Sequence, residues 1–82
     1  MKKRIVYTPI LVIDGRETGH LGPLIGLSKK ITSVPLGTII ELRSTDENLN
    51  DNFPYWVRKA GHEYLKIVPE DCYLRLLLRR LK

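Results

Sequence analysis

Few side chains in this 82-residue sequence are equipped for chemistry, and their small number limits what that chemistry is. Cys72 is the single thiol, and the two imidazoles belong to His20 and His62. One thiol forms no internal disulfide, and these three groups do not supply the four ligands of a zinc site. The sequence also shows no Ser-His-Asp or Cys-His arrangement and no Walker motif. It gives no support for independent catalysis, and we expect neither a metal nor a cofactor.

A glycine-containing segment before the first expected helix is a candidate binding site. The unpaired N–H groups at a helix N-terminus attract anions, and glycine leaves them accessible. Such a site for an anion or a partner would comprise Gly19, His20, Gly22 and Pro23. His20 could donate a hydrogen bond to an anion or carry a proton near neutral pH. The alternative is a solvated loop whose glycines serve turn geometry.

A second candidate surface places aromatic side chains among basic ones. Alternation along the last two expected strands puts these residues on one open sheet face: Tyr64, Lys66, Tyr73, Arg75 and Arg79. Such faces bind single-stranded nucleic acid through stacking and phosphate contacts. The alternative is an ordinary solvated face whose cations guard exposed strands against aggregation.

The formal net charge of +5 is unevenly distributed. Residues 2–4 and the last eight residues contain only basic charges, whereas residues 5–74 hold more acids than bases. With 43% hydrophobic and 28% charged residues, the chain has the composition of a globular domain. Its first 14 residues are apolar over too short a run for a signal peptide or a membrane span, so we expect a cytoplasmic protein.

The hydrophobic pattern predicts the elements that position these groups. We expect strands over residues 4–13, 38–45, 62–68 and 72–80, with Pro9 marking an edge or a bulge in the first. One helix runs from Pro23 to Val34, and a shorter one is marked by residues 53–60. Pro23 and Pro54 fit first helical turns, and Gly61 fits the position after the second helix.

This order predicts a single α+β domain over residues 1–82 with the topology β-α-β-α-β-β. Both helices should cover one face of a mixed four-stranded sheet, and the other face is open. In the last strand Leu74, Leu76 and Leu78 should face the helices. In the third strand the same alternation points Leu65 and Ile67 inward.

The sequence resembles the TusA/SirA/YedF family of small sulfur-carrier proteins, which share this two-layer architecture. The resemblance covers about residues 11–80 and is best in the second half. Residues 37–46 match the family's glycine, hydrophobic strand and Thr-Asp. The family's spacing from Asp46 is kept by Pro54, Trp56 and the segment Gly61-His62-Glu63.

The family's Gly-x-x-Cys-Pro-x-Pro motif is where this sequence departs. Matching Gly19 and Pro23 puts Gly22 at the cysteine position and Ile25 at the second proline, whereas matching the Lys29-Lys30 pair puts Leu21 there. Neither match supplies the thiol on which, as the resemblance implies, the family carries a persulfide. Cys72 belongs to the turn into the last strand, and we interpret it as a structural or bystander thiol.

These observations predict a noncatalytic TusA/SirA-like adaptor that docks a protein partner, a sulfur-relay or redox component, at the start of the first helix. The alternative is a small RNA-binding protein that uses the basic sheet face and termini. A lesser alternative is a sulfur carrier that uses Cys72.

Overall fold

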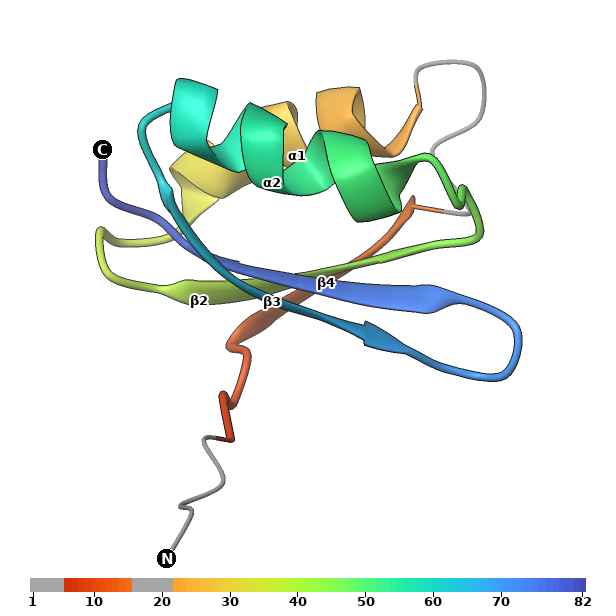
Figure 1. Cartoon of the computed structure of the whole chain (residues 1–82). Helices are drawn as coiled ribbons and strands as arrows, with labels where there is room; N and C mark the ends of the chain where they lie inside the picture. Colours follow the sequence, from red (N-terminus) through yellow and green to blue (C-terminus); the bar gives the residue numbers. More distant parts are fainter. Residues whose placement is uncertain (1–5, 16–21) are drawn as a thin grey trace, which may run out of the picture.

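Two helices lie side by side on one face of a four-stranded sheet (Figure 1). The computed structural model describes residues 6–15 and 22–82. Its elements are β1 (Leu11–Asp14), α1 (Pro23–Lys30), the short 3-10 helix η3 (Ile31–Ser33), β2 (Ile39–Ser44), α2 (Leu49–Lys59), β3 (Glu63–Pro69) and β4 (Leu74–Arg79). The predicted β-α-β-α-β-β architecture is confirmed. No helix in these described ranges is long and apolar enough to cross a membrane.

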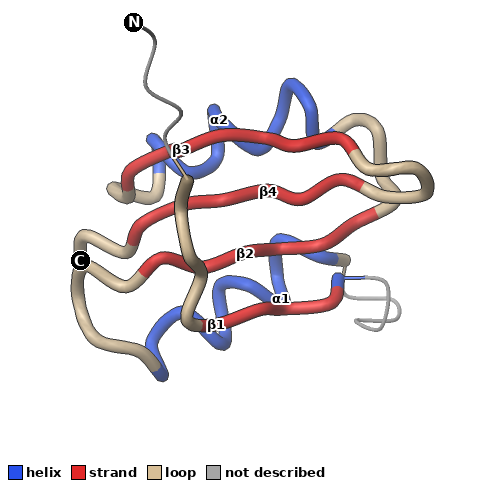
Figure 2. The backbone as a smooth tube through the Cα atoms, turned by 90° about the horizontal axis from the view of Figure 1, so that it is seen from below, coloured by secondary structure: helices blue, strands red, loops and turns tan. Residues whose placement is uncertain are grey.

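The strands lie in the order β1-β2-β4-β3, so β1 and β3 form the edges (Figure 2). β1 runs parallel to β2, and β4 is antiparallel to both β2 and β3. β1 is shorter than predicted because pairing begins only after Pro9, which has no N–H to donate. The first bond to β2 comes from the Ile10 N–H, which donates to the Ile39 carbonyl at 2.9 Å.

The first helix is followed by a tighter turn rather than continuing to Val34. α1 ends at Lys30, and η3 carries the chain on to Ser33. Leu27 of α1 and Ile31 of η3 are still buried against the sheet, as the predicted apolar stripe requires. The Ser33 hydroxyl donates to the Lys30 carbonyl at 2.6 Å, which satisfies an acceptor at the helix end.

The second helix begins one turn earlier than predicted, so Pro54 lies inside it rather than in its first turn. The first turn is stabilised by Leu49, whose side chain is buried in the core. The turn before the helix is stabilised by Asp46, whose carboxylate accepts a hydrogen bond from the Asn48 N–H at 3.0 Å. Burial of Leu49 and this turn bond together offset the bond that Pro54 cannot make.

The end of α2 agrees with the prediction for Gly61. This glycine has a φ of +88°, a left-handed conformation that favours glycine. Its N–H donates to the Arg58 carbonyl at 3.1 Å, and the His62 N–H donates to the Val57 carbonyl at 3.0 Å. These two bonds form a Schellman motif, which turns the chain directly into β3.

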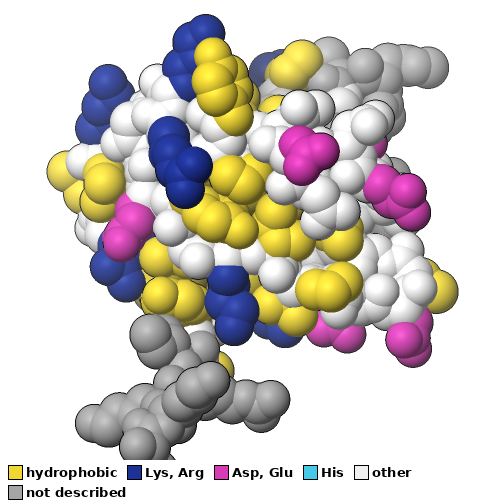
Figure 3. Space-filling view, in the orientation of Figure 1, with side chains coloured by type: hydrophobic (Ala, Val, Ile, Leu, Met, Phe, Trp, Pro, Cys, Tyr) yellow, Lys and Arg dark blue, Asp and Glu magenta, His cyan; other side chains and the backbone are white. Residues whose placement is uncertain are grey.

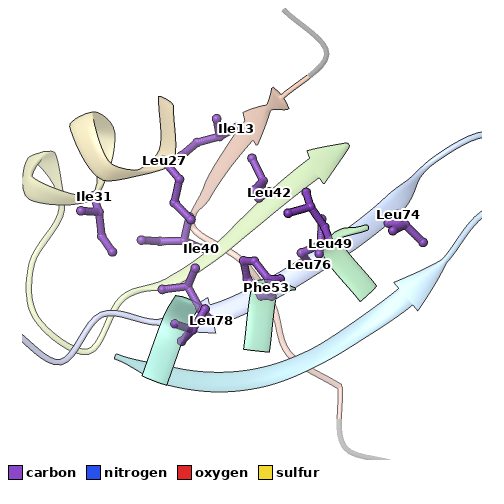
Figure 4. Close-up of a cluster of buried hydrophobic side chains, with 11 residues drawn as sticks. Ile13, Leu27, Ile31, Ile40, Leu42, Leu49, Phe53, Leu74, Leu76 and Leu78 are labelled. Atoms are coloured by element: carbon purple, nitrogen blue, oxygen red, sulfur yellow. The ribbon is translucent and has the colours of Figure 1, made fainter. Parts of the chain in front are cut away.

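The core lies between the helices and the sheet (Figure 4). Leu74, Leu76 and Leu78 of β4 face the helices, as predicted from alternation. Phe53 of α2 is fully buried. The cluster is completed by Ile13, Leu27, Ile31, Ile40, Leu42, Leu49 and Val57.

A β-bulge in β3 corrects the predicted orientation of two residues. The pairing with β4 shifts between Tyr64 and Lys66, so Leu65 is the extra residue. Tyr64 therefore turns to the helix face, where its ring meets Phe53 edge-on with centroids 6.1 Å apart. The prediction that Tyr64 lies on the open face is wrong, and Leu65 is not part of the buried cluster. Lys66, opposite Leu77, keeps its predicted place on the open face.

Candidate functional site

The start of α1 is built from backbone rather than from reactive side chains. Gly22 precedes the helix with φ +79° and ψ 160°, a combination that is essentially restricted to glycine. Its carbonyl accepts a hydrogen bond from the Gly26 N–H at 3.3 Å, and no side chain among the described residues caps the helix. Of the four predicted residues, Gly22 and Pro23 are described, whereas Gly19 and His20 lie outside the described residues.

The conformation of Gly22 determines which side chains this position accepts. A β-carbon added there would meet nothing within 4 Å, so space does not exclude a larger residue. The backbone conformation disfavours it, because a nonglycine residue with these φ and ψ values costs on the order of 1–3 kcal/mol of strain. A thiol at this position would therefore be held by a strained backbone. Ile25, two residues into the helix, presents an apolar side chain that is 49% exposed.

The single thiol lies on a different loop at the same end of the sheet. The loop between β3 and β4 contains Cys72, which is exposed, and Figures 1 and 2 place this loop and the start of α1 beyond the same strand ends. A shallow hollow there is lined by Thr45, Glu47, Glu70, Asp71, Cys72, Tyr73 and Leu74. Glu70 pairs with Arg75 at 3.7 Å, and the carboxylates of Glu47 and Asp71 would repel an approaching anion. Nowhere in the described residues do three His, Cys, Asp or Glu side chains form a group that could hold a metal ion.

The open sheet face carries a buried carboxylate that the sequence interpretation missed. Glu41 of β2 is 1% exposed. It lies between Arg43 of β2 and Arg75 of β4, which are cross-strand neighbours. Arg75 contacts one of its oxygens at 2.7 Å, and Arg43 contacts the other at 2.7 Å. Burial raises the pKa of Glu41, but the hydrogen bonds and charges of Arg75 and Arg43 outweigh it, so its pKa is lowered overall. The signal in the sequence was alternation, which puts Glu41 and Arg43 on one face of β2.

The predicted basic face is thus an ion-paired one. Besides Arg75, Arg79 is paired, with Glu63 at 3.1 Å. Arg43 lies over the ring of Tyr73, 5.7 Å from its centroid. Of the five predicted residues, the structure brings Lys66, Tyr73, Arg75 and Arg79 to this region. The carboxylates reduce the positive potential that it offers to phosphate groups.

Comparison with known proteins adds a family match to this geometry. Residues 21–80 match the family model described as "Sulfurtransferase TusA". The chain is also 36% identical over 73 residues to a protein of Archaeoglobus fulgidus described as "Putative sulfur carrier protein". That alignment covers 89% of this chain and all of the relative. No solved structure matches the chain.

Proposed function

Since the chain belongs to the TusA sulfurtransferase family, we propose that it acts in the cytoplasm as a protein-binding module of a sulfur relay without carrying a persulfide itself. The observation that carries this proposal is Gly22. It takes the cysteine position in one of the two matches to the motif, with Leu21 taking it in the other, and it combines the absence of a thiol with a φ of +79°. A persulfide needs a sulfur atom at the helix start, and this chain has none there.

The surface around the start of α1 supports binding of a protein partner rather than sulfur transfer. A partner approaching this helix meets a start that no side chain of residues 6–15 or 22–82 caps, and the exposed side chain of Ile25. An exposed apolar side chain beside backbone N–H groups is suited to a protein interface with an apolar centre. The start of α1 lies beside the carboxyl end of β1, which is an edge strand of the sheet (Figures 1 and 2).

Cys72 is a weaker basis for a function. Its thiol is accessible, but it belongs to the turn between two strands, where its neighbours Glu70 and Asp71 are acidic. A sulfur donor presents an anionic persulfide, which these charges oppose. We therefore assign Cys72 no part in the proposed binding.

The proposal predicts that a cysteine desulfurase, the class of enzyme that supplies sulfur to such relays, binds at the start of α1. Replacing Ile25 by aspartate should raise the dissociation constant at least tenfold, because a buried charge would face the partner. The change should leave the fold intact, since an acidic residue in a first helical turn is favourable. Isothermal titration calorimetry of the wild-type chain and the variant measures both constants.

Ile10 provides the matched control, because it is another exposed isoleucine and directly precedes the amino end of β1, whereas α1 follows the carboxyl end of that strand. Ile10→Asp should leave the affinity within about twofold of wild type. Equal losses in the two variants, or no binding by the wild-type chain, would refute docking at α1.

A further inference from the structure

Three segments that are distant in sequence meet at the end of the molecule opposite the start of α1. The Gly37 N–H donates to the Arg80 carbonyl at 2.6 Å, and the Arg80 N–H donates to the Thr38 carbonyl at 2.9 Å. On the other side, the Leu81 N–H donates to Nδ1 of His62 at 3.1 Å. The residues after β4 are therefore held between the loop before β2 and the turn after α2.

Six cations gather at this end, which we call the basic end. Both helices finish there, as Figures 1 and 2 show, and each carries two basic residues in its last turn. Two more follow β4, which gives the set Lys29, Lys30, Arg58, Lys59, Arg80 and Lys82. None of them belongs to an ion pair between described residues.

All described side-chain carboxylates except that of Glu63 lie away from the basic end. Glu63 is near the basic end, but it pairs with Arg79. Figure 3 shows basic side chains gathered toward the end that holds the C-terminus and acidic ones toward the other. The start of α2 and the β3–β4 loop carry the acids Asp46, Glu47, Asp51, Glu70 and Asp71. The two ends of the molecule thus have opposite charge.

Neutralisation of the helix dipoles explains only part of the basic end. Cations in the last turn of a helix stabilise it, which accounts for the pairs on α1 and α2. The helix dipoles do not account for Lys82, which is not helical. They also do not account for two exposed leucines on neighbouring segments, Leu36 and Leu81. Leu36 is 64% exposed and Leu81 is 51% exposed. The backbone bonds between Gly37 and Arg80 bring these two segments together.

We propose that the basic end binds an acidic segment of a protein partner, with Leu36 and Leu81 contacting its apolar side chains. Charge complementarity selects the acidic partner, and the leucines favour a protein over a nucleic acid. Bases would need exposed rings on which to stack, and the exposed ring of Tyr55 already has the ammonium group of Lys59 over one face, 5.7 Å from its centroid. This surface is separate from α1's start, so the chain would have two docking ends.

A fluorescent twelve-residue peptide of alternating glutamate and leucine is a suitable probe, with anisotropy as the readout. The wild-type chain should bind it, and raising the salt from about 50 to 300 mM should weaken binding severalfold through screening. A single-stranded RNA of equal charge should bind at least tenfold more weakly. Absence of peptide binding, or tighter binding of the RNA, would overturn the proposal.

Two variants with the same change in net charge locate the interaction. Lys30→Gln combined with Lys59→Gln should raise the peptide's dissociation constant about tenfold, whereas Lys66→Glu on the open sheet face should change it less than twofold. Ile25→Asp should also leave it unchanged, which separates this surface from docking at α1. Equal losses in the double variant and in Lys66→Glu would show a general charge effect and refute the assignment.

His62 supplies an internal reporter of where the peptide binds. Burial lowers the pKa of His62, and the charges of Arg80 and Lys82 lower it further. An acidic segment seated beside these cations should raise the pKa of His62, which a proton NMR titration detects. Peptide binding that leaves the pKa of His62 unchanged would place the peptide elsewhere and overturn the proposal.

Discussion

Replacing Phe53 by alanine is expected to lower the free energy of unfolding by about 3–5 kcal/mol, the range for deleting a buried aromatic side chain. Phe53 is fully buried and forms the edge-on contact with Tyr64. Its loss would therefore open a cavity between α2 and the sheet and remove support from the bulged part of β3. Urea unfolding followed by circular dichroism measures the change.

Tyr55 is the matched control because it is an aromatic residue in the same helix with its side chain 66% exposed. Tyr55→Ala should cost no more than about 0.5 kcal/mol, as for other surface positions. Similar losses from the two variants would contradict the assignment of Phe53 to the core and Tyr55 to the surface.

Replacing Glu41 by glutamine is expected to have the second-largest effect, a loss of about 2–3 kcal/mol. The amide keeps the shape of the side chain but removes the charge between Arg43 and Arg75, which lie directly opposite each other across β2 and β4. The loss should stay below that of a fully buried ion pair because both guanidinium groups reach solvent. Glu63→Gln, in the exposed pair with Arg79, should cost less than about 1 kcal/mol.

The difference in stability between wild type and Glu41→Gln should depend on pH. Because the pKa of Glu41 is lowered in the folded chain, its stabilisation is complete above the ordinary carboxyl value of 4.5 and is lost as the pH falls below it. The stability of wild type should therefore approach that of Glu41→Gln in this acidic range. A constant difference between the two proteins from pH 7 to pH 3 would contradict the role of the Glu41 charge.

Much of the fold could be predicted because local patterns and packing agree. Alternation in β4 correctly placed Leu74, Leu76 and Leu78, and the chemistry of glycine correctly placed the end of α2 at Gly61. The orientation of Tyr64 could not be predicted, because a one-residue bulge reverses the alternation and leaves no mark in composition. The start of α2 was missed because burial of Leu49 overrides the preference of Pro54 for a first turn.

The candidate sites were less predictable than the fold. Alternation in the last two strands indicated a basic sheet face, but it could not show that β2 brings a buried glutamate between Arg43 and Arg75. The basic end was likewise hidden, because its cations come from α1, α2 and the residues after β4. Only the absence of a thiol at the start of α1 could be read directly from the sequence.

We propose that this member of the family binds within a sulfur relay but carries no sulfur. The most direct test is to incubate the wild-type chain with a cysteine desulfurase and cysteine and to measure its intact mass under nonreducing conditions. We predict an unchanged mass, with Cys72 recovered as a free thiol after alkylation. An added mass of about 32 Da, one sulfur atom, that maps to Cys72 and disappears on reduction would contradict the claim.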